Sequence, residues 1–353
     1  MAKSKKSIAL VLRTCKSDLT SRNGFQWADV GGTTTAPDWV NNKDCGNGLH
    51  GWLFGAGDHS CSNYLDAESK WMVLEVELKT IVMLGEKCKF PSAKTVFVGD
   101  KKSATDYLIA NEPRAKNVAV IGASLEVGDN GAVLVGNLGT ATAGNWGTAT
   151  AGESGTATAG YKGTATAGNW GTATAGYKGT ATAGYKGTAT AGNWGTATAG
   201  YKGTATAGES GTATAGESGT ATAGYKGTAT AGNWGTATAG YKGTATAGYK
   251  GTATAGNWGT ATAGNWGTAT AGESGTATAG NWGTATAGYK GTATAGYKGT
   301  ATAGYKGEIR IQYWDSKAER YRTEIGYIGE DGLKANTAYK LDDNHKFVEV
   351  EGE

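Results

Sequence analysis

Four side chains that can bind zinc lie close together near the N-terminus, at Cys45, His50, His59 and Cys61. Cysteine thiolates and histidine nitrogens are common zinc ligands, and the glycine-rich intervals between these residues could fold them round a metal. Their spacing, C-x4-H-x8-H-x-C, matches no standard zinc module. We therefore expect no metal and interpret these residues as buried thiols and loop-anchoring histidines, with zinc as the alternative.

A second candidate group consists of Arg13, His50 and Glu75, which are a cation, an imidazole and a carboxylate that could converge in a cleft. No motif joins the three, and polar residues at strand ends are usually solvated or paired without catalysis. We therefore expect no catalytic residue, no cofactor and no enzyme. The cysteines, which form no C-x-x-C pair, are predicted to be free thiols: Cys15, Cys45, Cys61 and Cys88.

The elements that position these side chains belong to a small β-rich head domain, residues 1–119. Residues 7–13, 71–78 and 95–98 alternate as strands do, whereas residues 24–64 are rich in glycine, asparagine and tryptophan and are expected to form long loops. Ser103 is a plausible N-cap for a short helix that ends before Pro113.

The longest feature of the chain is an array of 21 uninterrupted octads over residues 136–303, each reading Gly-x-x-Gly-Thr-Ala-Thr-Ala. Each octad predicts a five-residue strand, Gly-Thr-Ala-Thr-Ala, and a tight corner, Gly-x-x, in which glycine supplies the positive φ of a sharp turn. Short strands that recur at a fixed period indicate a β-solenoid.

Imperfect octads at both ends show which side of each strand faces inward. Where perfect octads have alanine, these units carry large apolar residues, and where perfect octads have threonine, they are mostly polar or small. Alanine is therefore expected to point in and threonine out. Leu134 is the exception, and we expect the head domain to cover it. The large residues are expected to cap the array: Leu125, Val127, Val133, Val135, Ile309 and Ile311.

With the imperfect units, the solenoid spans residues 120–311, which is 24 octads. Two octads per coil give about 12 coils and a rod of roughly 58 Å at ~4.8 Å per coil. Three octads per coil are the alternative, but alanine and glycine would leave a triangular interior hollow. Backbone ladders and stacked identical side chains must supply much of the stability, because the core buries little apolar area.

The two variable positions of the octads hold few residue pairs. Counting the unit at Gly304, they are Tyr-Lys ten times, Asn-Trp seven times, Glu-Ser four times and Asn-Leu once. In a two-octad coil these pairs stack along two edges and form tyrosine ladders with lysines beside them. Tolerated variation at exposed corners is one interpretation. The other is a self-association seam that includes Trp146, Tyr161, Trp170, Tyr177, Tyr185, Tyr201, Tyr241 and Tyr249.

Residues 312–353 lose the octad period and predict a C-terminal β cap of short strands. Tyr313 and Trp314 are expected to cover the last coil. Glu319, Arg320 and Arg322 are expected to face water, and His345 to be a solvated loop residue.

Charge and the N-terminus limit the partners. The net charge of the chain is +3, and the octads supply ten lysines against four glutamates, so the basic excess is spread along a surface, which argues against specific nucleic-acid recognition. Lysines at positions 3, 5 and 6 precede an apolar run, residues 8–12, that is shorter than a signal-peptide core or a membrane span. A cytoplasmic location is the default expectation, with a surface or exported form as the alternative.

The octads resemble the repeats of bacterial ice-nucleation proteins, in which Gly-Tyr corners separate strands that carry a Thr-x-Thr motif. The resemblance covers residues 120–311 and implies a β-solenoid whose threonine rows order water, with tyrosine ladders that support self-association. The ice-facing rows would begin with Thr148, Thr150, Thr156, Thr158, Thr164 and Thr166. This array differs in using Thr-Ala-Thr in every octad and in being short. The overall layout also resembles uncharacterised bacterial and phage octapeptide-repeat proteins.

The sequence therefore predicts an all-β chain: a head (1–119), a β-solenoid (120–311) and a capping segment (312–353). The preferred function is a rigid structural rod that self-associates into dimers or filaments. The first alternative is an ice-binding or water-ordering protein, because outward threonines form a regular grid. The second alternative is an enzymatic or ligand-binding activity of the head.

Overall fold

The structure is a computed structural model that describes residues 7–350 of the 353-residue chain. The chain forms two compact units, Met1–Ala143 with Ala149–Ala157 and Gly144–Thr148 with Thr158–Glu353. The lysines at positions 3, 5 and 6 lie outside the described residues. Within residues 7–350, no helix is long and apolar enough to cross a membrane.

A seven-stranded antiparallel sheet forms the β-rich N-terminal part, with the strand order β2-β7-β4-β1-β3-β6-β5. The three predicted strands are confirmed as β1, β4 and β7, which lie side by side in this sheet. The expectation of loops throughout residues 24–64 is wrong for β2 and β3, which are short and pair with strands far away in the sequence. The bounds are β1 (Ile8–Cys15), β2 (Thr33–Thr35), β3 (Leu49–Leu53), β4 (Lys70–Glu77), β5 (Val82–Met83), β6 (Cys88–Phe90) and β7 (Ser92–Gly99).

Helix α1 (Lys101–Asn111) ends before Pro113, as predicted, but it begins earlier than expected. Its N-cap is Asp100, whose carboxylate accepts the Ser103 backbone N–H at 2.7 Å, so the prediction of Ser103 as N-cap is wrong. Four 3-10 helices complete this part of the chain: η1 (Arg22–Gly24), η2 (His59–Cys61), η3 (Leu78–Thr80) and η4 (Pro113–Asn117).

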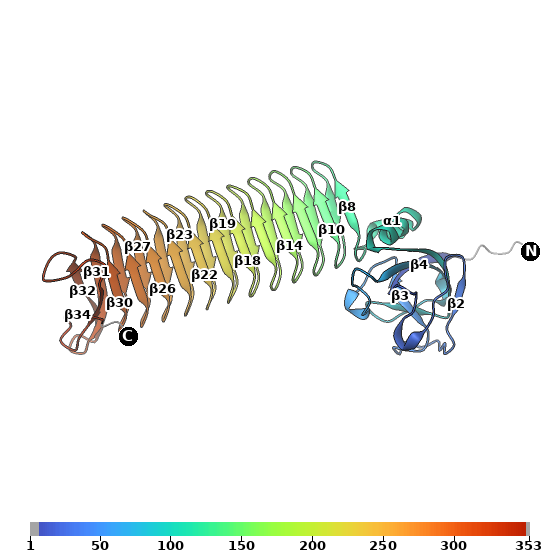
Figure 1. Ribbon diagram of the computed structural model, residues 1–353, viewed down its shortest axis with the longest axis horizontal. Helices are drawn as coiled ribbons and strands as arrows, with labels where there is room; N and C mark the ends of the chain where they lie inside the picture. Colours follow the sequence, from blue (N-terminus) through green and yellow to red (C-terminus); the bar gives the residue numbers. More distant parts are fainter. Residues whose placement is uncertain (1–6, 351–353) are drawn as a thin grey trace, which may run out of the picture. The chain divides into compact units, whose positions relative to one another are not determined.

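The octads form a β-solenoid in which each octad contributes one strand (Figure 1). Strands β10 (Thr140–Ala143) to β30 (Thr300–Ala303) repeat every eight residues, preceded by β8 (Ser124–Val127) and β9 (Ala132–Leu134). Even-numbered and odd-numbered strands form separate parallel sheets, so that each strand pairs in register with the strand 16 residues away. The prediction of two octads per coil and about 12 coils is confirmed.

The solenoid interior consists of alanine, as the imperfect octads predicted. In β19 (Thr212–Ala215), Ala213 and Ala215 are 0% and 3% exposed, whereas Thr212 is exposed and Thr214 is half-buried. The strands contain four residues, not the five expected, because the preceding glycine belongs to the turn. The prediction that alanine points in and threonine points out is confirmed.

The expected role of glycine at the corners is wrong. The corner is a Gly-x-x-Gly turn closed by a hydrogen bond such as Gly219 N–H to the Gly216 carbonyl, 3.1 Å. The positive φ lies at the second variable residue, for example +55° at Ser218, and not at either glycine. A positive φ at the third turn residue is the pattern of type II turns, in which glycine is the usual occupant of that position.

The turn glycines are required by close packing between coils. A methyl group at Gly216 would lie 2.9 Å from the Gly200 carbonyl carbon, in the backbone of the preceding coil. At Gly219 it would lie 2.8 Å from both the Ala215 Cβ and the Gly203 carbonyl oxygen. Real Cβ atoms do not come this close to backbone atoms, so a larger residue at either position would force the coils apart.

The C-terminal segment adds antiparallel strands to both sheets of the solenoid. Strand β31 (Glu308–Asp315) pairs with β32 (Arg320–Tyr327), and β33 (Ala338–Leu341) pairs with both β30 and β34 (Phe347–Glu349). These strands cover the C-terminal edges of both sheets, which blocks pairing with another chain there. Glu319, Arg320 and Arg322 are exposed, as predicted.

The side chains at the two ends of the solenoid differ in burial. At the C-terminal end Ile309 and Ile311 are buried, and Tyr339, at 2% exposed, is also buried. Tyr313 is half-buried and Trp314 is 42% exposed. His345 is not a freely solvated loop residue, because its ring stacks on Tyr313 with centroids 3.9 Å apart.

At the N-terminal end, Val133 and Val135 are buried, whereas Leu125 and Val127 are half-buried. Leu134 is 51% exposed, so the expectation that the head covers it is wrong. Leu134 ends β9 and lies between the buried Val133 and Val135, so its side chain points to the outer side of the sheet.

Candidate functional site

The first candidate site is the pair of threonine faces on the two solenoid sheets. In-register pairing places Thr212 beside Thr196 and Thr228, so identical residues form columns across the coils. The two columns of a sheet lie ~6.8 Å apart along each strand, and successive coils are ~4.8 Å apart. The predicted row residues follow this alternation: Thr148, Thr156 and Thr164 are exposed, and Thr150, Thr158 and Thr166 are half-buried.

The threonine hydroxyls of these columns are available to solvent. Within strands β10 to β30, no threonine hydroxyl forms a hydrogen bond with another described group of the protein. The backbone groups of the same residues are paired between coils, as in Thr212 N–H to the Gly195 carbonyl, 2.9 Å. Each face is therefore a fixed grid of methyl groups and unused hydroxyls, which can hold bound water in regular rows.

The second candidate site is formed by the corner side chains, which stack along the two edges of the solenoid. Tyr161 and Tyr177 stack with ring centroids 5.6 Å apart, and Tyr185 and Tyr201 do the same, which confirms the tyrosine ladders. Each corner lysine lies over the ring of the tyrosine before it, at 5.3 Å for Lys186. These contacts order the long side chains along the edge.

Tryptophans interrupt the tyrosine ladders and expose large apolar surface. Trp146 packs edge-on against Tyr161 and Trp170 against Tyr185, yet both tryptophans remain more than half exposed. The other predicted edge residues also belong to ladders: Tyr241 stacks on Tyr225, and Tyr249 meets Trp234 edge-on. Repeated exposed aromatic side chains are typical of protein contact surfaces.

An asparagine ladder at the same corners was missed by the sequence reasoning. Each asparagine at the first variable position accepts, through Oδ1, the backbone N–H of the corresponding residue in the next coil. Asn233 accepts from Tyr249 at 3.0 Å, and Asn145 accepts from Tyr161 at the same distance. The signal in the sequence was that asparagine occurs at the first variable position and never at the second.

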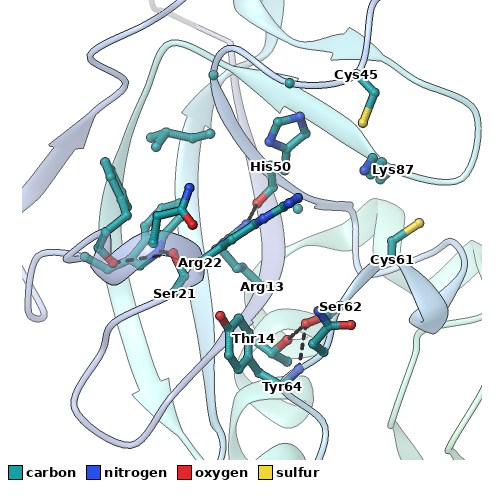
Figure 2. A pocket seen from close by; sticks show the side chains of 18 of the residues that line it. Arg13, Thr14, Ser21, Arg22, Cys45, His50, Cys61, Ser62, Tyr64 and Lys87 are labelled. Carbon is teal, nitrogen blue, oxygen red and sulfur yellow. Dashed lines mark hydrogen bonds between the residues drawn. The ribbon is translucent and has the colours of Figure 1, made fainter.

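The third candidate site is a cleft of about 660 Å³ in the head. It lies beside β1 and β3 and is lined by Arg13, His50, Cys45 and Cys61, together with polar and aromatic side chains (Figure 2). His59 lies elsewhere, because its Nδ1 is 3.0 Å from the side-chain nitrogen of Asn137.

The four zinc candidates are therefore not gathered round one point. No group of three or more His, Cys, Asp or Glu side chains among residues 7–350 is placed to hold a metal. Cys45 and Cys61 are exposed free thiols, so the expectation that they are buried is wrong. Cys15 and Cys88 are also free, and burial raises their thiol pKa to about 11 and about 12, which keeps them protonated and unreactive.

Two members of the Arg13, His50 and Glu75 group meet in the cleft. The Arg13 Nη1 donates a hydrogen bond of 2.6 Å to the His50 carbonyl oxygen. Glu75 does not line the cleft; it lies in β4, paired in register with Leu10 and Lys94. No carboxylate therefore completes the group, and the convergence expected for a catalytic triad is not present.

The polar groups of the cleft are strongly affected by burial. Burial lowers the Arg13 pKa to about 10, so the guanidinium is still a cation at neutral pH. Burial, with the nearby charges of Lys87 and Arg13, lowers the His50 pKa to about 4, so the imidazole is neutral. The cleft thus has a permanent cation beside an uncharged ring.

The loop that carries Cys45 is held in place by Lys89, a residue the sequence reasoning did not single out. Lys89 is 0% exposed, and its Nζ donates to the Asn42 side chain at 2.6 Å and the Asp44 carbonyl at 2.9 Å. A buried lysine that binds a loop in this way fixes one wall of the cleft.

Parts of the chain match one family model and several curated proteins. Residues 9–110 match a family model described as Domain of unknown function (DUF7666). The chain is 37% identical over 106 residues to an ice nucleation protein of Pseudomonas syringae, a match that covers 30% of this chain and 9% of that protein. It is 45% identical over 122 residues to an ice nucleation protein of Xanthomonas campestris pv. translucens, covering 33% and 7%.

The matched segments span no more than about a tenth of these relatives. No solved structure matches the chain. The resemblance of the array to ice-nucleation repeats, predicted from the octads, is confirmed.

Proposed function

We propose that the threonine faces of the solenoid bind ice or an ice-like layer of ordered water, and that the chain is a structural repeat protein of this kind. The observation that carries the proposal is the in-register Thr-x-Thr grid with hydroxyls not used by the protein. Bound water costs less entropy when its partners are already fixed, and parallel ladders fix these hydroxyls on a rigid sheet.

The curated relatives support the proposal, because they are named ice nucleation proteins. The size of the faces limits the kind of ice activity that one chain can have. The ten or eleven perfect octads of each sheet give a face roughly 50 Å long at ~4.8 Å per coil. We therefore infer that one chain binds and shapes existing ice, and that efficient nucleation would require several chains arranged together.

Thermal hysteresis and ice-crystal shape test the proposal on the full chain. Threonine to valine keeps the shape of the side chain and its preference for strands but removes the hydroxyl. One variant changes four threonines of the even-numbered sheet, Thr188, Thr204, Thr220 and Thr236, and a second variant also changes Thr180, Thr196, Thr212 and Thr228. A control changes four corner lysines to glutamine, Lys178, Lys186, Lys202 and Lys226.

The wild type and the lysine control are expected to shape ice crystals and to show equal hysteresis. The first threonine variant should lose part of that activity and the second most of it, with unchanged far-UV circular dichroism. A wild type that behaves as buffer does, or a second variant with full activity, contradicts the proposal.

A second function, self-association along the corner ladders, is supported by the exposed tryptophans. Trp194 and Trp258 are 57% and 58% exposed, and each lies close to a lysine of the preceding coil. Buried aromatic side chains dominate protein contacts, so two edges of this kind could pair and place threonine faces side by side.

Sedimentation of a variant with all ten corner tyrosines, from Tyr161 to Tyr305, changed to serine tests this second function. Loss of dimers or filaments in the variant is expected. If the wild type associates and the variant has the same sedimentation coefficient, the tyrosines do not form the contact.

A further inference from the structure

The head cleft contains a half-buried cation, Arg13, that no described side chain of the protein neutralises. The Arg13 guanidinium lies 4.3 Å above the centroid of the Trp27 ring and donates from Nη1 to a backbone carbonyl. No acidic side chain among the described residues forms an ion pair with it. Partial burial of a charge without a counter-charge is costly, so an arginine whose Nε is buried in this position points to a partner that arrives from outside.

Two buried side-chain atoms in the described part of the chain have no hydrogen-bond partner, and both are in this cleft. They are the Arg13 Nε and the His50 Nε2. Buried donors and acceptors are nearly always paired in native proteins. Their joint occurrence in one cleft is the expected arrangement of a binding site in its free state.

The remaining lining gives the cleft a positive charge and apolar walls. Arg22 and Lys87 add two cations, and Asp38 is the acidic residue of the lining, with one carboxylate oxygen accepting the Gly48 N–H at 3.0 Å. Phe25 and other aromatic side chains line the walls. Figure 2 shows Arg13 in the middle of the labelled residues, between His50 and the hydroxyls of Thr14 and Ser62.

We propose that this cleft binds a small molecule that carries a carboxylate or phosphate group on a flat apolar body. The oxyanion accepts from the Nε and Nη2 edge of Arg13, which has no partner in the protein and offers two parallel N–H donors. The apolar body lies against the aromatic walls. A cleft of about 660 Å³ has the size of a small-molecule site, larger than an isolated ion needs.

The roles of the surrounding groups follow from this placement. Lys87 and Arg22 attract the anion and contact its outer oxygens, whereas Trp27 fixes the plane of the Arg13 guanidinium. Lys89 holds the loop that closes one side. Because all these residues belong to the head, the inference is independent of the proposed function of the threonine faces.

Isothermal titration calorimetry on the full chain at low ionic strength tests the proposal with three probes: benzoate, phenyl phosphate and the uncharged benzamide. Benzoate and phenyl phosphate distinguish a carboxylate from a phosphate ligand. The better anion is expected to bind at least about tenfold more tightly than benzamide, which corresponds to ~1.4 kcal/mol. Equal binding of all three probes, or no binding of either anion, overturns the proposal.

Variants test whether Arg13 binds the anion and distinguish loss of binding from loss of folding. Arg13→Met should abolish anion binding, and Arg13→Lys should weaken it strongly because a lysine lacks the two parallel donors. Lys87→Gln, at the side of the cleft, should weaken binding several-fold without unfolding the head. The matched control is Lys102→Gln on α1, which removes one positive charge outside the lining.

The control also separates a specific site from general attraction to a basic protein. Lys102→Gln should leave affinity unchanged, and near-UV circular dichroism should confirm that each variant keeps the packing of the head. If Lys87→Gln and Lys102→Gln lower the affinity equally, or if folded Arg13→Met binds as the wild type does, the assignment is wrong.

Discussion

Two adjacent residues in one corner of the solenoid are predicted to respond in opposite directions to small changes, Ser218→Gly and Gly219→Ala. Ser218 has a φ of +55°, in the left-handed region, which costs a non-glycine residue roughly 1–2 kcal/mol. Glycine relieves that cost but loses roughly 0.5–1 kcal/mol through its freer unfolded chain. The backbone bond from residue 218 to the Asn233 carbonyl is kept. Ser218→Gly should therefore be neutral or stabilising by up to about 1.5 kcal/mol.

Gly219→Ala should destabilise the same corner. The added methyl group would lie 2.8 Å from the Ala215 Cβ and the Gly203 carbonyl oxygen, and 2.9 Å from the Gly216 carbonyl oxygen. None of these atoms belongs to a flexible side chain, so the coils themselves must move. Overpacking of this kind costs about 1–3 kcal/mol.

Local hydrogen exchange is the appropriate assay, because solenoid coils open locally and one unfolding midpoint would average over all of them. Two of the four Glu-Ser octads are adjacent, and this happens only once in the sequence, so a peptide over residues 208–223 can be identified unambiguously. A loss of about 2 kcal/mol corresponds to roughly 30-fold faster exchange in that peptide for Gly219→Ala. Faster exchange in Ser218→Gly with no effect in Gly219→Ala would refute the reasoning.

Three further predictions concern single contacts. Asn233→Ala removes the 3.0 Å hydrogen bond from the Tyr249 N–H and should cost about 1 kcal/mol, which faster hydrogen exchange of that amide measures. The control is Tyr225→Ala at the same position of another corner, which should leave the exchange of the corresponding amide in the next coil unchanged. Burial lowers the His50 pKa to about 4, so between pH 6.5 and pH 4 the unfolded chain binds more protons than the folded head does. The head should therefore lose stability as the pH falls through this range, by at most about 3 kcal/mol, a value that partial exposure of the ring makes smaller. Thermal unfolding of His50→Gln should show a weaker dependence on pH. Lys89→Met should cost about 2–4 kcal/mol through the loss of its bonds to Asn42 and Asp44, and it should weaken binding in the cleft, which calorimetry with the better anionic probe measures.

The architecture of the solenoid could be predicted because its period and its imperfect copies carry separate information. The eight-residue repeat gives the strand spacing, and the large residues at Val133, Val135, Ile309 and Ile311 show which side of each strand is buried. In-register stacking then follows, because identical octads pair most favourably with one another.

The corner geometry could not be predicted from propensity alone. Glycine is the residue that most readily adopts a positive φ, so a turn with two glycines suggested that one of them does so. In the structure both glycines are needed for contact between coils, and the positive φ falls on a neighbour such as Ser218. Close approach between residues 16 positions apart leaves no local signal in the sequence.

The head was less predictable because its sheet is built from distant pairings. Strand β3 pairs with β1 and β6, and its five residues, which include a glycine, show no clear alternation. The cleft depends on the same pairings, because Arg13 and His50 come from neighbouring strands. The sequence identified both residues as chemically interesting, but it attached Glu75 to them and did not identify Trp27 or Lys87.

Uptake of the purified chain into slowly growing ice tests directly whether the threonine faces bind ice, because it requires no assumption about assembly. The wild type should be enriched in the ice fraction, and the variant with valine at eight threonines of both sheets should stay in the liquid. A wild type excluded from ice to the same extent as that variant would contradict the assignment of the threonine faces as the functional surface.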